Sequence, residues 1–309
     1  MDIIDLLEKR IINLPKGEYS SGIEAVLQHI KTAVRHFENG KNDDTLFTDA
    51  IYRTNQAFEG SLKEAYRVLE GKDPKDIRPY DIENYFVEKG IFKERVLNQF
   101  KNYRTEWRNP STHDYRLNFN EDEALLAIVS VTAFALVLTD QIAEKLSYLN
   151  AFESSSQLKP NNNIDNLADA AASLLLNFKF LRDNQAADEP PNGYELVGAV
   201  AGYLAAMLPP DIDVATGVRI EHGGYFIIAD VVLRRGNETV IIEIKRKFLR
   251  IRQVESNVIH LSGYMAVGGI KEAILFFYSH EDKWEIEKRE YPVLDGQARI
   301  IAICPVGAG

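Results

Sequence analysis

The stretch ADVVLRRGNETVIIEIKR, residues 229–246, consists of two apolar runs separated by Gly-Asn at 236–237. Such a pair between β-branched runs is typical of a two-residue hairpin turn, and glycine at the first position suits type II′. This register places Asp230 opposite Glu243. Because valine and isoleucine occupy both faces of the strands, the stretch predicts a sheet that is covered on both sides.

The charged residues of this hairpin need a chemical reason. Carboxylates on directly opposed strand residues repel each other, since their Cβ atoms lie only about 4.5–5.5 Å apart. A divalent cation, Mg²⁺ or Mn²⁺, held by Asp230, Glu243 and the backbone carbonyl of Ile244 would turn this repulsion into binding. Lys245 shares the strand face of Glu243 and could orient or deprotonate a water. The alternative is a salt-bridged trio on the solvent face of an amphipathic hairpin.

The composition limits the class of protein. With 309 residues, 45% hydrophobic and 27% charged, the chain is of an ordinary globular type with room for two cores. Cys304 is its only cysteine, which rules out a disulfide within the chain and favours a reducing cytoplasm. No secretory signal is evident at the N-terminus. The net charge of -10 argues against a broadly basic surface, so any nucleic-acid site must be local.

The first part of the chain has helical periodicity. One segment, ALLAIVSVTAFALVL at 124–138, has about 15 apolar residues against the roughly 20 that cross a bilayer, and we expect a buried core helix and no membrane span. The apolar spacing predicts an all-α helical bundle over residues 1–153. Its helices are expected at 23–37, 45–71, 80–90, 92–107 and 121–147.

The second part of the chain has a different pattern. The polar, turn-rich stretch at 154–163 is expected to be a linker, and residues 164–309 to be an α/β domain. Helices are expected at 163–182, 194–208 and 252–267, and strands at 214–220, 225–233, 238–246, 272–279, 284–293 and 298–305. The fold class is therefore multi-domain, all-α followed by α/β.

The order of residues and elements around the hairpin resembles a known family. Asp, a hairpin and Glu-x-Lys, with a helix before and a helix and strand after, are similar to the PD-(D/E)xK restriction-endonuclease-like nucleases over roughly residues 190–280. Ala229 stands where the family name has proline. The resemblance implies a mixed sheet and Mg²⁺-dependent hydrolysis of DNA, with Asp230, Glu243 and Lys245 as catalytic residues.

The resemblance also implies supporting residues. Family members often add a helical glutamate to the metal shell, and Glu195 fits, although an acid favoured by the helix dipole is an equal alternative. Polar residues of the later helix, Gln253 first and then His260 and Tyr264, are further candidates. The stretch KRKFLRIR at 245–252 is locally basic and suits phosphate binding, whereas the alternative is a solvated basic turn. Its expected nucleic-acid-binding residues are Arg246, Lys247, Arg250 and Arg252.

A second motif lies in the helical half, in WRNPSTHDY at 107–115. Pro110 breaks the helix and allows Arg108 and His113 to approach each other. The guanidinium of Arg108 can bind a phosphate, and the imidazole of His113 can transfer a proton. The pattern resembles the HEPN domains over roughly residues 20–148. It implies metal-independent RNA cleavage by Arg108 and His113, with Asn109 supporting the loop, in a homodimer formed by the bundle. Alternatively, Arg108 and His113 only cap the loop.

Together these patterns predict a cytoplasmic nuclease that acts on DNA and also on RNA. By family habit it would be a prokaryotic effector of defence against phages or plasmids. One alternative is a non-catalytic nucleic-acid or nucleotide sensor that the HEPN-like bundle dimerises. Another is a HEPN ribonuclease toxin that a separate nucleotidyltransferase controls.

Overall fold

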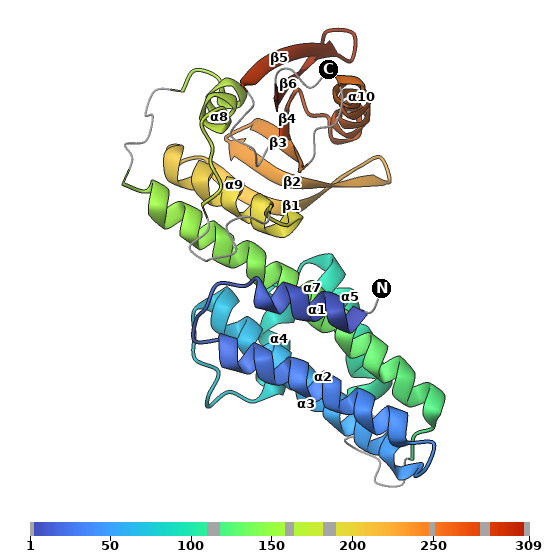
Figure 1. Ribbon diagram of the computed structural model, residues 1–309. Coiled ribbons are helices and arrows are strands. Elements are labelled where there is room, and N and C mark those ends of the chain that lie inside the picture. Colours follow the sequence, from blue (N-terminus) through green and yellow to red (C-terminus); the bar gives the residue numbers. More distant parts are fainter. Residues whose placement is uncertain are drawn as a thin grey trace. The chain divides into compact units, whose positions relative to one another are not determined.

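The computed structural model describes most of the chain (Figure 1). It describes residues 3–109, 118–157, 164–181, 190–246, 251–278 and 285–305, and for Glu94, His222, Ile251 and Arg252 only the backbone. The chain divides into two compact units, Met1–Lys145 and Leu146–Gly309. The first is helical and the second holds a six-stranded mixed sheet with helices. The expected combination of an all-α and an α/β region is thereby confirmed.

The helical unit contains the expected helices and two elements that the sequence patterns did not indicate. These two are the N-terminal helix α1 and a π-helical turn, η1, at the end of α5. Its elements are α1 (Ile3–Ile12), α2 (Ser20–Asn39), α3 (Thr45–Glu70), α4 (Pro79–Lys89), α5 (Glu94–Tyr103), η1 (Arg104–Arg108) and the first part of α7 (Glu121–Ser155).

Aromatic rings fill the core of the helical unit. The Phe58 ring lies 4.7 Å from that of Tyr103 and 5.0 Å from that of Phe134, between ring centroids. Tyr103 is fully buried, and its hydroxyl donates a hydrogen bond to Asn55 Oδ1 at 2.9 Å. Phe134 lies on α7. That helix is long and apolar enough to cross a membrane by length and composition, yet 61% of its most apolar window is buried, as expected for a core helix.

The end of α7 belongs to the second unit. Tyr148 and Ala151 pack against the core on one face of the sheet. A Cβ added to Gly202 of α9 would lie 2.1 Å from the carbonyl oxygen of Tyr148, so the two helices are in backbone contact there. The division between the units therefore lies inside α7, whereas the sequence pattern placed it at the polar stretch 154–163.

The sheet of the second unit has the strand order β1-β2-β3-β4-β6-β5. The pairs β1–β2, β2–β3 and β5–β6 are antiparallel, whereas β3–β4 and β4–β6 are parallel. Helices α8 and α9 precede the sheet, and α10 connects β3 to β4. The bounds are α8 (Leu167–Leu175), α9 (Gly193–Met207), β1 (Asp213–His222), β2 (Tyr225–Arg235), β3 (Glu238–Lys245), α10 (Ile251–Gly268), β4 (Glu272–Phe277), β5 (Ile286–Val293) and β6 (Ala298–Pro305).

Both faces of the sheet are covered, as the apolar strands predicted. One core lies under α8 and α9 and includes Val231, Ile242 and Ile244. The other lies under α10 and includes Val232 and Ile241. Neighbouring residues of β3 alternate between these cores, so Glu243 belongs to the face that α10 covers.

The hairpin of β2 and β3 has the expected register. Its pairs run from Arg235 and Glu238 at the turn to Val231 and Ile242, so the ladder ends one position before the expected pair of Asp230 and Glu243. Gly236 has φ of 55°. A positive φ at the first turn residue alone is the type II′ pattern, so the Gly-Asn prediction is confirmed in register and turn.

β1 and β2 both change faces at one point. Ala229 packs on the α10 side, but Val231, two residues later, packs on the α9 side. In a regular strand these two residues would point the same way. On β1, the pairs at Thr216 and Val218 leave Gly217 opposite Asp230, and Gly217 has φ of 59°. The two strands therefore bend together at Gly217 and Asp230.

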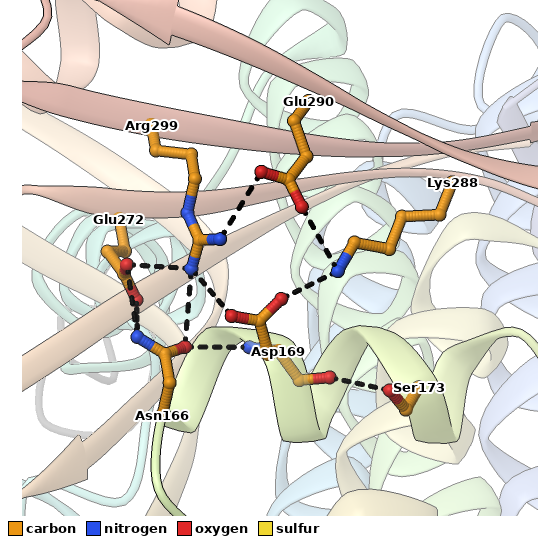
Figure 2. A network of polar contacts seen from close by, with 7 residues as sticks. All are labelled: Asn166, Asp169, Ser173, Glu272, Lys288, Glu290 and Arg299. Atoms are coloured by element: carbon orange, nitrogen blue, oxygen red, sulfur yellow. Dashed lines mark hydrogen bonds and ion pairs between the residues drawn. The ribbon is translucent and has the colours of Figure 1, made fainter.

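A polar network fastens α8 to the start of β4 and β6 (Figure 2). Asn166 accepts the amide of Asp169 at 2.8 Å and donates to Glu272 at 3.1 Å. Arg299 bonds Asp169 and Glu272, each at 2.9 Å. Lys288 of β5 lies 2.6 Å from Asp169 and, with Arg299, lowers the pKa of that carboxyl. The network lies at the amino ends of the parallel strands, away from the carboxyl end of β3.

Candidate active site at the carboxyl end of β3

Asp230 and β3 are joined by a side-chain hydrogen bond. Asp230 Oδ2 accepts the backbone amide of Ile244 at 2.8 Å. In a continued β2–β3 ladder that amide would bond to Ala229, but the register pairs end at Val231 and Ile242. Asp230 thus takes the place of a main-chain partner at the point where β2 bends away.

The same break presents a main-chain oxygen. In an antiparallel hydrogen-bonded pair, the amide and the carbonyl of one residue point to the same neighbouring strand. The amide of Ile244 points to Asp230, and the carbonyl of Lys245 accepts the Tyr278 amide at 2.8 Å on the β4 side. The carbonyl of Ile244 therefore points toward β2 and Asp230.

Glu243 and Lys245 form an ion pair at the end of the strand. Lys245 Nζ lies 2.7 Å from Glu243 Oε1. The side chain of Lys245 is 29% exposed and that of Glu243 15%. The pairing expected for a salt-bridged trio is therefore present in part. Its location differs from that alternative, because both residues lie on the face that α10 covers and not on an open solvent face. Partly buried charges at a strand end have stronger electrostatic interactions than solvated ones.

The donor set fits a hard divalent cation. Two carboxylates and one main-chain carbonyl, from Asp230, Glu243 and Ile244, offer the oxygen ligands that Mg²⁺ and Mn²⁺ take, with waters completing the coordination. Within the described part of the chain, no group of three or more His, Cys, Asp or Glu side chains is arranged to hold a metal ion. A cation here would depend on main-chain and water ligands besides the two acids.

Glu195 has a definite role at the start of α9. Its carboxylate accepts the amide of Asn192 at 2.7 Å, while Asn192 Oδ1 accepts the amide of Glu195 at 3.0 Å. This reciprocal capping box satisfies amides at the helix N-terminus. Glu195 thus lies in the first turn of α9, where the helix dipole favours an acid, and it also closes a capping box that sequence reasoning did not foresee; its metal role stays a prediction.

Arg246 connects the site to that helix start. Its Nη1 donates to the carbonyl of Pro191 at 3.3 Å, and its Nε would lie 3.9 Å from a Cβ on Gly193. The contact brings the N-terminus of α9, and Glu195 with it, to the end of β3. Arg246 is exposed, so a phosphate contact remains compatible with this position.

The other predicted residues of the C-terminal site are described less fully. Lys247 and Arg250 lie outside the described residues, and of Arg252 only the backbone is described. Gln253 lies in the first turn of α10, half-buried, and its carbonyl accepts from Asn257 at 2.6 Å. Two further polar candidates on α10, His260 and Tyr264, are in ring contact at 4.5 Å between centroids.

The HEPN-like motif is described only in its first residues. His113 lies outside the described residues. Arg108 ends the π-helical turn η1, where its Nη2 lies 3.7 Å from Glu59 of α3 and its Nη1 donates to Asn109 Oδ1 at 3.3 Å. Asn109 is exposed. Arg108 is thus bonded to the residue expected to support the loop.

A buried acid lies beside this motif and was not foreseen. Glu83 of α4 is 1% exposed, with Arg104 of η1 at 3.7 Å. Burial raises the pKa of Glu83, and the charges of Arg108 and Arg104 oppose that rise. Both arginines therefore act on one carboxyl. The sequence gives only a weak signal for the burial of Glu83. The signal is an acid at a position of YDIENYFVEK where the helical pattern expects an apolar residue.

Gly217 is the residue of the C-terminal site that sequence reasoning missed. Its signal was a glycine inside a strand pattern, in VATGVRI, which indicates a bend or a close backbone approach.

The chain was compared with family models, with curated proteins and with solved structures, and none of the three comparisons gives a match. The two family resemblances therefore stay predictions that rest on the residues above.

Proposed function

We propose that the chain is a nuclease whose C-terminal unit hydrolyses phosphodiester bonds of DNA with Mg²⁺ or Mn²⁺. The observation that carries the proposal is that Asp230 accepts the Ile244 amide where the β2–β3 ladder ends, and that Ile244 lies between the two residues of the Glu243–Lys245 ion pair. Helix α9, three antiparallel strands, α10 and the parallel strand β4 follow in the order of restriction-endonuclease-like domains, which supports that fold. Ligand sites in parallel sheets also tend to lie at carboxyl strand ends.

Each residue has a distinct part in this chemistry. Asp230, Glu243 and the carbonyl of Ile244 would hold the cation, which would act as a Lewis acid toward a phosphate oxygen and lower the pKa of a bound water. Lys245 is held at 2.7 Å from Glu243, so its ammonium group is fixed beside the acids. From there it offsets the negative charge that develops on the phosphate and orients the attacking water.

The test measures cleavage and metal binding together. Supercoiled plasmid DNA and RNA are incubated with the full chain, with Mg²⁺ or with chelator, and Mn²⁺ binding is followed by electron paramagnetic resonance. We expect Glu243→Gln and Lys245→Met each to lower DNA cleavage at least about 100-fold, and Asp230→Asn and Glu243→Gln to weaken Mn²⁺ binding. Glu238→Gln, at the exposed start of β3, is the matched control.

The outcomes separate the proposal from its alternative. Wild-type cleavage by Glu243→Gln would remove this site from the reaction. A wild-type protein that binds DNA but leaves it intact in Mg²⁺ would support the non-catalytic sensor instead.

RNA cleavage by the helical unit is the second candidate function. The observation in its favour is that Arg104 and Arg108, four residues apart on η1, both act on the Glu83 carboxyl. Two guanidinium groups close together beside the Arg-Asn motif suit the grip of a phosphate. Catalysis would further need the imidazole of His113. Cleavage of foreign nucleic acid would make the protein an effector of defence against phages or plasmids. RNA cleavage alone would favour a toxin that a separate nucleotidyltransferase controls.

A further inference from the structure

The outer half of the β1–β2 hairpin exposes an aromatic and apolar surface. Tyr225 is 72% exposed, Phe226 51% and Ile228 48%. Ile227 and Ala229, the neighbours of Ile228 on either side, are buried on the α10 side, so Phe226 and Ile228 point to the other face of the hairpin. In Figure 1 the hairpin extends beyond the other strands of the sheet. Large exposed side chains gathered in this way mark a binding surface more often than isolated ones do.

An arginine stacks on this surface. The guanidinium carbon of Arg219 lies 3.8 Å from the centroid of the Phe226 ring. Arg219 is opposite Ile228 in the strand register, and its Nε donates to Glu221 on the same strand. Glu221 thus fixes the guanidinium plane against the ring. We call Arg219, Phe226 and Ile228 the hairpin platform.

The hairpin platform leads to the candidate active site. Phe226, Ile228 and Asp230 occupy alternate positions of β2, and Asp230 is where the strand changes faces. At about 3.3 Å per residue, Phe226 lies roughly 13 Å along the strand from Asp230. A nucleic-acid strand a few nucleotides long is sufficient to span that distance.

The edge of the sheet is unsuited to a second protein strand. β1 is the edge strand on the side of the hairpin, and it carries the exposed charges Asp213, Arg219 and Glu221 and the bend at Gly217. Charges and bends on an edge strand oppose pairing with another chain. A flat ring with a stacked guanidinium, in contrast, suits the face of a nucleic-acid base, which can stack on it in any sequence.

We propose that the hairpin platform binds an unpaired base of the substrate, so that the C-terminal site acts on single-stranded nucleic acid or on strands with unpaired bases. The proposal rests on the proposed nuclease function for the meaning of Asp230. It specifies the strand state of the substrate, because bases inside a duplex are already stacked and cannot reach the ring.

The test measures binding apart from cleavage. Labelled single-stranded and duplex DNA of one sequence are titrated with the full chain in chelator, and binding is followed by fluorescence anisotropy. We expect wild type to prefer the single strand, and Phe226→Ala to weaken that binding about tenfold or more without changing duplex binding. Phe226→Trp should retain it, and Phe226→Leu should behave like alanine because it has no ring. Tyr80→Ala, an aromatic residue of similar exposure in the helical unit, is the matched control.

The outcomes distinguish this proposal from the nuclease proposal. Single-strand binding that Phe226→Ala and Arg219→Gln leave unchanged, or that Phe226→Leu restores, overturns the hairpin platform even if Mg²⁺-dependent cleavage is observed. If Phe226→Ala loses single-strand binding and the wild type does not cleave DNA, the hairpin platform is supported and the nuclease proposal is contradicted. A wild-type dimer that Phe226→Ala dissociates in sedimentation would make this surface a self-interface and overturn the proposal. Unchanged thermal melting of each variant confirms that it folds.

Discussion

Asp230 holds β3 through its carboxylate and is also a proposed metal ligand. Its Oδ2 accepts the Ile244 amide, while its charge lies next in register to Glu243. Asp230→Ala removes the acceptor, and we expect a loss of about 1–3 kcal/mol in the free energy of unfolding. Asp230→Asn keeps an acceptor oxygen and removes the like-charge repulsion, so its stability should equal or exceed that of wild type. Urea denaturation in chelator measures both, and equal stability of the two variants would contradict this role.

For Glu83 we predict the opposite effect, because its buried negative charge destabilises the fold. Because burial raises the pKa of Glu83 above its unfolded value, the folded state binds the proton more tightly, and the charged form destabilises the fold as pH rises through that window. Glu83→Gln should therefore melt higher than wild type at pH 7, with the difference shrinking toward pH 4. Glu88→Gln, exposed on the same helix, is the control. If Glu83→Gln were less stable than wild type at pH 7, the interaction of the Glu83 charge with Arg104 and Arg108 would be net stabilising, which would contradict this prediction.

Residue types in register made part of the candidate site predictable. Asp230, Glu243 and Lys245 follow from the hairpin pattern alone, because turn chemistry fixes which residues lie opposite. The hydrogen bond of Asp230 to Ile244 does not follow, since it depends on where the ladder opens. Glu83 was missed for a related reason: helical periodicity identifies a buried position but does not reveal which arginines surround it.

At the scale of elements, the bend in β1 and β2 depends on Gly217. Its φ of 59° costs a residue with a Cβ about 1–2 kcal/mol. Gly217→Ala should lower stability by that amount and reduce Mg²⁺-dependent cleavage by shifting Asp230. Gly263→Ala on α10, where no atom lies within 4 Å of the added Cβ, should be neutral or stabilising by up to about 1 kcal/mol. Thermal melts compare the two, and a fully stable Gly217→Ala would refute the bend as a constraint.

The network of α8 with β4, β5 and β6 predicts a pH-dependent stability. Lys288 and Arg299 lower the pKa of Asp169 below its unfolded value, so the pairing stabilises the fold above about pH 4 and is lost as pH falls through the folded pKa. Asp169→Asn should cost about 0.5–1 kcal/mol at pH 7. The difference should shrink as the pH falls below about 4 and through the lowered folded pKa, and also in high salt. A cost that is the same at neutral and at strongly acidic pH would assign the effect to packing.

Helices and strands were predictable where their periodicity is strong. Alternation and apolar runs gave the six strands, because turn residues separate them. The face change at Gly217 was not predictable, since it cancels the alternation on which strand prediction relies. The reach of α7 to Ser155 was also missed. Residues 148–155, YLNAFESS, mix apolar and polar residues, and packing of Tyr148 and Ala151 on the sheet core keeps them helical.

At the scale of the whole molecule, the helical unit carries the prediction of a homodimer with a composite ribonuclease site. One Arg108 and His113 supply a phosphate grip and one proton-transfer group, whereas attack by a 2′-hydroxyl needs a base and an acid. Two copies about a two-fold axis supply both. His113→Ala should lose RNA cleavage in chelator, remain dimeric in sedimentation and keep Mg²⁺-dependent DNA cleavage. His36→Ala is the control. A monomeric wild type, or RNA cleavage unaffected by His113→Ala, would exclude the mechanism.

The shared helix α7 has a consequence for how the chain can be divided. Ala124 and Ile128 belong to a core of the helical unit, and Tyr148 and Ala151 to a core of the sheet unit. A protease cut in the stretch 154–163 would separate the sheet unit from Tyr148 and Ala151, which add to the cover that α8 and α9 give to one of its faces. The isolated sheet unit would then expose apolar surface and aggregate. A sheet unit expressed alone should therefore begin at about Leu146, so that it keeps the end of α7 on its core.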